Sequence, residues 1–147
     1  MINRKEFSKY WYNMGKELKE NNVYKFFTLY ISFNALYNEY SARYERDRIK
    51  KFLRNNQNIG IKLSIKNDGE FYKKIVMDMR TGEETDKLSY NIDEIRNNDI
   101  MAIFMGIYQV RCNLFHGSKK DLDRDRCLIE ESCILLEDFL EQYFNYI

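Results

Sequence analysis

The stretch "FFTLYISFNALYNEY", residues 26–40, decides the fold that we predict for this chain of 147 residues. Its aromatic residues recur at intervals of three or four, which is the spacing of one face of an α-helix. We expect this bulky stripe to form core or a subunit interface, and Asn34 beside it needs a hydrogen-bond partner if it is buried. The stripe consists of Phe26, Tyr30, Phe33, Tyr37, Tyr40 and Tyr44.

A helical pattern continues through most of the chain. Proline is absent and there are only six glycines, so few residues interrupt a helix. Asn3 and Glu6 form a capping-box pattern that predicts the start of a first helix, and Ser118 after Gly117 predicts the start of the last one. The expected helices cover residues 3–19, 26–54, 91–116 and 118–147.

Each of the other three helices has apolar residues three or four positions apart. Such residues share one face of a helix. In the first helix they are Phe7, Trp11, Met14 and Leu18. In the helix that ends at residue 116 they are Ile100, Ile103, Ile107, Val110 and Leu114. In the last helix they are Ile129, Cys133, Leu136, Leu140, Tyr143 and Ile147.

Residues 56–95 follow this pattern less well. Alternating apolar residues predict two short strands, at 59–65 and 88–92, with a short helix at 68–79 between them. We therefore expect a single all-α domain over residues 1–147, a helical bundle with a small irregular or short-strand insertion at 56–95.

The net charge of +1 hides an uneven distribution of charge along the chain. Residues 1–66 hold 14 Lys and Arg against 6 Asp and Glu, whereas residues 67–147 hold 10 against 17. The basic part could attract a polyanion, or the two parts could complement each other in the fold. Positive charge is densest over 41–54, where Arg46, Lys50 and Arg54 are candidate RNA-binding residues; a solvated helix face is the alternative.

Other features of the composition bear on location and cofactors. Cys112, Cys127 and Cys133 have no metal-site spacing and are expected to be buried, reduced thiols. The sequence has neither a signal-peptide pattern nor an apolar run of about 18 residues, so we expect a soluble, cytoplasmic protein without a membrane span. We expect no cofactor and no metal.

The segment "QVRCNLFHG", residues 109–117, contains the only histidine and is the candidate catalytic stretch. On a regular helix Arg111 and His116 lie about 140° apart around the axis. Gly117 is expected to end that helix. His116 would then lie at a tight helix–helix corner, where the backbone can turn it back toward Arg111.

These residue types suit phosphate chemistry. Arginine can hold two phosphate oxygens at once, and histidine exchanges protons near neutral pH. The N-terminus of the helix that begins at Ser118 is a natural anion site. The structural alternative is a histidine that stabilises the end of its helix through the helix dipole. The expected auxiliary and RNA-binding neighbours of the pair are Tyr108, Asn113, Ser118, Lys119 and Lys120.

The segment "VRCNLFHG" resembles the R-x4-H motif of the HEPN superfamily (higher eukaryotes and prokaryotes nucleotide-binding). "FTLYISFNALYNEY" is similar to an aromatic helix of some prokaryotic members, close to the Apea-like group. The resemblance covers residues 7–45 and 96–146. It implies a helical bundle that commonly dimerises and thereby brings two R-x4-H motifs to one cleft.

The resemblance also implies an activity. Many members are metal-independent endoribonucleases of toxin–antitoxin, abortive-infection and CRISPR-associated systems, whereas others bind nucleotides or protein partners without catalysis. Arg111 and His116 are the residues that carry over as catalytic. The residue after the arginine is often Asn, Asp or His in the family; here it is Cys112, a departure that bears on the polar auxiliary role.

One histidine per chain agrees with dimerisation. Cleavage through the 2′-hydroxyl needs a base and an acid, and two chains supply two histidines, while the arginines would stabilise the added negative charge. The sequence predicts a metal-independent ribonuclease of toxin or antiviral-defence type that acts as a homodimer, with an antitoxin or another protein as a further candidate partner. Two alternatives stay open: a non-catalytic HEPN module that binds nucleotide, RNA or a protein, and an unrelated helical interaction domain.

Overall fold

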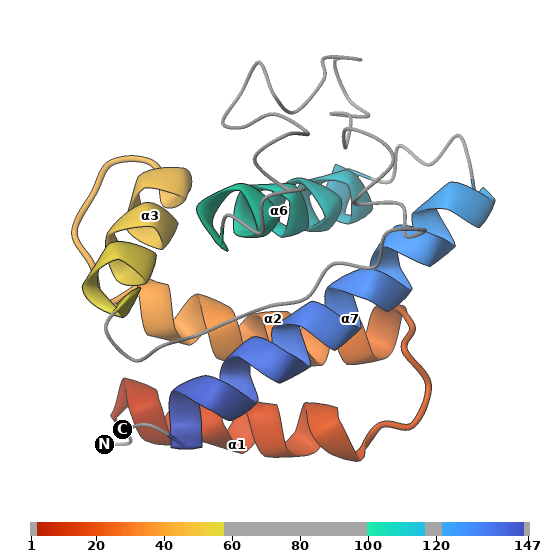
Figure 1. Ribbon diagram of the computed structural model, residues 1–147, viewed down its shortest axis with the longest axis horizontal. Coiled ribbons are helices and arrows are strands. Elements are labelled where there is room, and N and C mark those ends of the chain that lie inside the picture. The colour runs from red at the N-terminus through yellow and green to blue at the C-terminus, as the bar shows by residue number, and fades with distance from the viewer. Residues whose placement is uncertain (1–2, 58–99, 117–121, 146–147) are drawn as a thin grey trace. The chain divides into compact units, whose positions relative to one another are not determined.

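The computed structural model describes residues 3–57, 100–116 and 122–145 (Figure 1). Helices hold 84% of these residues and none of them is in a strand, which confirms the predicted all-α class. Nearly all of the expected insertion at 56–95, the expected helix start at residue 91 and the Ser118 cap lie outside the described residues. The helices are α1 (Arg4–Glu17), α2 (Val23–Tyr37), α3 (Glu45–Asn55), α6 (Ile100–His116) and α7 (Leu122–Asn145).

The chain divides into two compact units. The terminal unit comprises Met1–Lys62 and Ser132–Ile147, and the central unit comprises Leu63–Glu131. Helices α1, α2 and α3 belong to the terminal unit and α6 to the central unit, while α7 contributes residues to both.

Helices α1 and α2 pack closely in the terminal unit. As predicted, Asn3 caps α1: its Oδ1 accepts a 2.8 Å hydrogen bond from the Glu6 amide. Ser8 and Ser32 join the two helices, because each Oγ donates to the other residue's carbonyl oxygen at 2.7 Å. Gly15 allows the close approach, since a Cβ there would lie 2.5 Å from Leu29 Cδ2.

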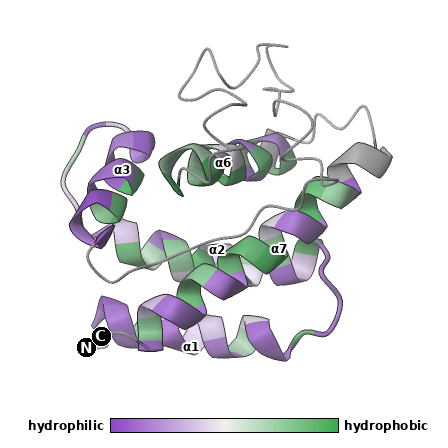
Figure 2. Cartoon of the chain, viewed as in Figure 1, coloured by the Kyte–Doolittle hydropathy of each residue, from purple (hydrophilic) through white to green (hydrophobic). Residues whose placement is uncertain are grey.

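The buried side of α1 is not the face on which its apolar residues recur. Its buried residues are Ser8, Tyr12 and Gly15. Phe7, Met14 and Leu18 are 42%, 43% and 39% exposed, and Trp11 is half-buried. For Ser8 and Gly15 the contact with α2 explains the difference, because two helices that approach this closely need small residues between them, whereas the Tyr12 ring packs against Phe144 of α7. Hydrophilic residues dominate α1 and α3, whereas α2 is mostly hydrophobic (Figure 2).

The predicted continuous helix over 26–54 is wrong, because the chain leaves the helix after Tyr37 and re-enters it at Glu45. Side chains of α3 hold the connecting loop: Arg48 Nη1 donates to the Ala42 carbonyl at 2.9 Å, and Lys51 Nζ donates to the Ser41 carbonyl at 2.5 Å. The carbonyl oxygens of Ser41 and Ala42, which accept no helical hydrogen bond in the loop, therefore have side-chain donors. These hydrogen bonds offset the cost of interrupting the helix.

Much of the aromatic stripe forms the core of the terminal unit, as predicted. Phe33 is fully buried, with its ring centroid 5.9 Å from that of Phe52 on α3 and 5.8 Å from that of Phe139 on α7. The break changes the end of the stripe: Tyr40 is half-buried in the loop, and Tyr44 is 56% exposed.

Helix α6 of the central unit is buried on most of its circumference. The expected residues Ile103, Ile107 and Val110 are buried. Ala102, Phe104 and Met105 are buried as well, so the apolar surface is wider than a single stripe. In α7 the buried side includes the predicted Ile129, Cys133, Leu136, Leu140 and Tyr143. Within the described parts of the chain, no helix has the length and apolar character needed to cross a bilayer.

Candidate functional site

Arg111 lies near the C-terminal end of α6 and is half-buried. Its Cζ is 5.4 Å from the centroid of the Tyr108 ring, one turn earlier in the helix, which is cation–π geometry. Its Nη1 donates a weak, 3.9 Å hydrogen bond to Cys112 Sγ. Tyr108 thus lies beside the guanidinium and restricts the directions in which Arg111 can extend, while its role as an auxiliary residue stays a prediction.

Asn113 lies on a different side of α6. Its Oδ1 accepts a 3.0 Å hydrogen bond from Nε2 of Gln109, which is buried. Two residues along a helix correspond to about 200° of rotation, so Asn113 does not share a face with Arg111. Asn113 and His116 are three residues apart and do share a face. Of the predicted auxiliary residues, Tyr108 therefore lies on the face of Arg111, and Asn113 lies on the face of His116.

His116 is the last residue of α6. Because the backbone is helical from Arg111 to His116, the two residues keep a separation of about 140° around the axis and about 7.5 Å along it. The side chain of His116 lies outside the described part of the structure, as do Gly117, Ser118, Lys119 and Lys120. The expected turn of His116 back toward Arg111 therefore stays a prediction.

The predicted RNA-binding residues Arg46, Lys50 and Arg54 are all on α3, in the terminal unit. They follow one another at four-residue intervals, so they lie along one edge of the helix, about 6 Å apart. Arg54 is exposed, and Arg46 and Lys50 are half-buried.

A polar cluster at the junction of α2 and α3 has no counterpart in the sequence predictions. Tyr37 donates a hydrogen bond to Glu45 Oε2, and Asn34 Nδ2 donates to the Tyr37 hydroxyl at 2.8 Å and to Glu45 Oε2 at 3.2 Å. The hydroxyl of Tyr30 is 3.1 Å from that of Tyr37. Asn34 thus has the partners that its position beside the stripe required.

This cluster changes the chemistry of Tyr37. Burial raises the pKa of the Tyr37 hydroxyl above its ordinary value, and the hydrogen bond to the Glu45 carboxylate raises that pKa further. The phenol stays a neutral donor as a result. Two tyrosines and an asparagine on one helix face, followed by a glutamate, were the signal in the sequence; the helix break that brings Glu45 to them was not visible there.

Within the described residues, no group of three His, Cys, Asp or Glu side chains lies together as a metal site would need. Cys112, Cys127 and Cys133 form no disulfide with one another. Cys133 is buried as expected, whereas Cys112 and Cys127 are half-buried, so the prediction of three buried thiols is wrong for these two.

Comparison with known proteins finds no match to this chain, whether among family models, curated proteins or solved structures. The resemblance of residues 109–117 to the HEPN motif therefore stands on the sequence alone.

Proposed function

We propose that the chain is a metal-independent endoribonuclease of toxin or antiviral-defence type, which cleaves RNA at a cleft between two identical chains. The observation that carries this proposal is the position of Arg111 and His116 within the last turns of one helix, with Tyr108 beside the guanidinium. The half-buried Arg111 is a fixed positive charge whose conformational freedom is reduced before substrate binds.

The separation of the two residues supports a requirement for two chains. About 140° of rotation separates Arg111 from His116 on the helix, so one chain does not readily direct both at the same phosphate. Two copies of α6 would surround one phosphodiester with two arginines and two histidines. In this arrangement Asn113, on the same face as His116, and Ser118 are auxiliary polar groups.

The reaction proposed for this cleft is transesterification. One His116 accepts the proton of the 2′-hydroxyl as its oxygen attacks phosphorus, and the other His116 gives a proton to the 5′-oxygen as the P–O5′ bond breaks. The two Arg111 guanidinium groups stabilise the extra negative charge on the five-coordinate phosphorus. The products are a 2′,3′-cyclic phosphate and a 5′-hydroxyl.

The experiment is incubation of purified protein with end-labelled RNA in the presence of a chelator. We expect cleavage products that carry 2′,3′-cyclic phosphate, and loss of cleavage by at least about 100-fold in Arg111→Ala and His116→Ala. Arg4→Ala, at an exposed arginine of α1, is the matched control and should cleave like the unmodified protein. An RNA with a single 2′-deoxy nucleotide at the cleaved position should resist cleavage there.

Retention of cleavage in either motif variant would overturn the assignment of catalytic residues. Products with a 3′-hydroxyl would overturn the mechanism, because hydrolysis by an activated water would then be the reaction. Analytical ultracentrifugation of the same samples tests whether the active protein is a dimer. A monomer with full activity would contradict a cleft shared by two chains.

A second candidate function follows from Cys112. Arg111 Nη1 donates to the Cys112 thiol sulfur, a weak acceptor, where the resembling family often has a polar residue. This contact favours a non-catalytic HEPN module that binds nucleotide, RNA or a protein partner. Binding of RNA without cleavage of any RNA tested, and with the same affinity in His116→Ala, would select this function over the nuclease.

A further inference from the structure

The positive charges of α3 fall into two groups with different surroundings. Arg48 and Lys51 are held by the loop before the helix: Arg48 Nε donates to Asn38 Oδ1 at 3.2 Å, and Lys51 Nζ donates to the Ser41 carbonyl at 2.5 Å. These two side chains stabilise the loop. They are therefore less available to an external ligand.

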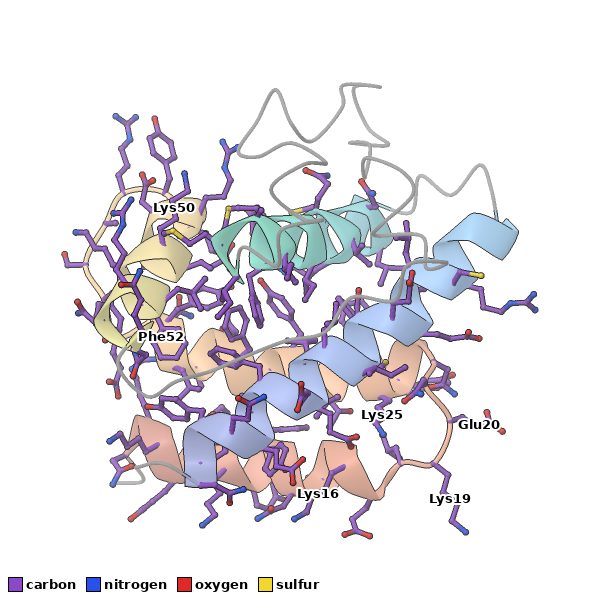
Figure 3. The ribbon with its side chains drawn as sticks, viewed as in Figure 1. Lys16, Lys19, Glu20, Lys25, Lys50 and Phe52 are labelled. Atoms are coloured by element: carbon purple, nitrogen blue, oxygen red, sulfur yellow. The ribbon has the colours of Figure 1, made fainter. Side chains whose placement is uncertain are left out.

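The second group is the basic row, Arg46, Lys50 and Arg54. In the described part of the chain, no carboxylate forms an ion pair with Lys50 or Arg54. Glu45, the first residue of α3, has its carboxylate hydrogen-bonded to Tyr37 and Asn34. Asp47 is then the remaining acidic residue of α3, which also holds five basic residues. Lys50 is labelled on α3 in Figure 3.

An exposed aromatic residue precedes this row. Tyr44 is the N-cap residue of α3 and is 56% exposed. Arg43 Cζ lies 5.2 Å from the centroid of the Tyr44 ring. A cation thus lies over one face of the ring, while a large part of the surface of Tyr44 contacts solvent. Aromatic rings placed next to basic residues are the usual means of binding unpaired bases.

We propose that Tyr44 and the basic row of α3 bind a single-stranded nucleic acid, with a base stacked on the Tyr44 ring and phosphates beside Lys50 and Arg54. Charge complementarity identifies the ligand as a polyanion, and the exposed ring identifies it as one with unstacked bases. A duplex offers phosphates but no free base faces. This inference goes beyond the proposed function, because the surface belongs to the terminal unit and binds whether or not the α6 motif cleaves.

The test is binding of fluorescently labelled 12-nucleotide oligomers to the full chain, followed by anisotropy. A 2′-O-methyl oligouridylate is the main probe, because it has no 2′-hydroxyl nucleophile and cannot be cleaved by the proposed mechanism. Single-stranded DNA and a blunt RNA duplex of the same length are the other probes. Circular dichroism melting of each variant checks that it is folded.

We expect Lys50→Glu combined with Arg54→Glu to weaken binding at least about tenfold and to reduce the magnitude of the slope of log affinity against log salt by about 1.4, because each phosphate contact with a single strand contributes about 0.7. The matched control is Lys5→Glu with Lys9→Glu, the same charge change at exposed positions of α1, which should weaken binding far less. Tyr44→Ala should weaken binding about tenfold, whereas Tyr44→Phe keeps the ring and should stay within about twofold of the unmodified protein.

Several results would overturn the proposal. They are the absence of binding to both single strands, equal binding of duplex and single strand, equal loss in the α1 control, and unchanged affinity in Tyr44→Ala. Binding of RNA or DNA single strands supports it, and their relative affinities identify the polymer. Binding by a chain that fails to cleave RNA supports this surface while refuting the nuclease, so the two proposals fail separately.

Discussion

The ammonium group of Lys25 lies 3.1 Å from Glu137 Oε1 and donates a 2.9 Å hydrogen bond to the Leu18 carbonyl. Lys25 is in the first turn of α2, Leu18 is the C-cap residue of α1, and Glu137 is in the part of α7 that belongs to the terminal unit. One cation thus links three helices. The Lys25 side chain is 6% exposed and the Glu137 side chain 35%. The buried ammonium group therefore needs the ion pair more than the carboxylate does, because the carboxylate can also be hydrated.

The first prediction is that Glu137→Gln destabilises the protein more than Lys25→Met does. Removal of the carboxylate leaves a buried ammonium group with only neutral acceptors, and we expect a loss of about 2 kcal/mol in the free energy of unfolding. In Lys25→Met the partly exposed Glu137 can reach water, and the loss should be about 1 kcal/mol. Urea unfolding measures both values. Glu130→Gln, at an exposed position of α7, is the control and should leave the free energy of unfolding nearly unchanged. A larger loss in Lys25→Met than in Glu137→Gln would contradict the prediction.

The second prediction concerns pH and Tyr37. Its raised pKa means that the folded chain holds the phenolic proton more tightly than the unfolded chain does. Its contribution to stability is therefore complete below the ordinary tyrosine pKa of about 10 and declines as pH rises above that value. Above about pH 10, the free energy of unfolding of the unmodified protein should fall by up to about 1.4 kcal/mol per pH unit more than that of Tyr37→Phe does.

Urea unfolding at intervals between pH 8 and pH 11 checks this difference. Tyr12 and Tyr143, whose pKa values burial also raises, are present in both proteins, so their titration cancels in the comparison. Tyr37→Phe should also be less stable at pH 8, because Glu45 loses a donor. Parallel pH profiles for the two proteins would show that Tyr37 titrates alike in the folded and unfolded chains.

The third prediction is a coupling between Ser8 and Ser32. Both residues are fully buried, and their hydroxyl groups lie 2.9 Å apart. Ser8→Ala or Ser32→Ala alone leaves one buried carbonyl without its hydroxyl donor and the remaining hydroxyl without its 2.9 Å contact to the other hydroxyl, at a cost of about 1–3 kcal/mol. The double variant removes both hydroxyls, so we expect it to be more stable than the sum of the single losses implies by about 1 kcal/mol. Additive losses in urea unfolding would contradict the reciprocal pair.

Helix formation was predictable from the sequence because it depends on local periodicity and caps. Asn3 caps α1 as expected, and α6 extends to His116. The break after Tyr37 was not predictable in this way. It depends on Arg48 and Lys51, which reach back to Asn38, Ala42 and Ser41, and periodicity records helical repeats but no contacts of this kind.

The face of α1 that is buried was hidden for a related reason. The hydrophobic pattern predicted that the side of Phe7 and Met14 would be buried. The side that packs against α2 instead contains Ser8 and Gly15, because small residues allow the two helices to approach closely. At the candidate site, helical spacing alone predicted that Tyr108 accompanies Arg111. The cluster around Glu45 required knowledge of the break.

The fourth prediction is that Gly15→Ala destabilises the protein. At an exposed helical position this change would stabilise by about 1 kcal/mol through helix propensity. At Gly15 the new Cβ would lie 2.5 Å from Leu29 Cδ2 and 2.8 Å from Leu29 Cγ, and Leu29 is fully buried and cannot move aside freely. We expect a net loss of about 1–3 kcal/mol in urea unfolding. Asn13→Ala, exposed on the same helix, should be neutral or stabilising, and a stabilised Gly15→Ala would contradict the close packing.

The fifth prediction concerns Cys112 and rests on the proposed nuclease. The thiol next to Arg111 is a weak acceptor, and an amide oxygen at the same position would be a stronger one. One added hydrogen bond to a guanidinium that stabilises the transition state corresponds to about a tenfold increase in cleavage rate. We therefore expect Cys112→Asn to cleave RNA faster than the unmodified protein, and Cys112→Ala to cleave at nearly the same rate. Single-turnover cleavage with protein in excess measures the chemical step. A rate for Cys112→Asn equal to that of Cys112→Ala would show that this position does not act through Arg111.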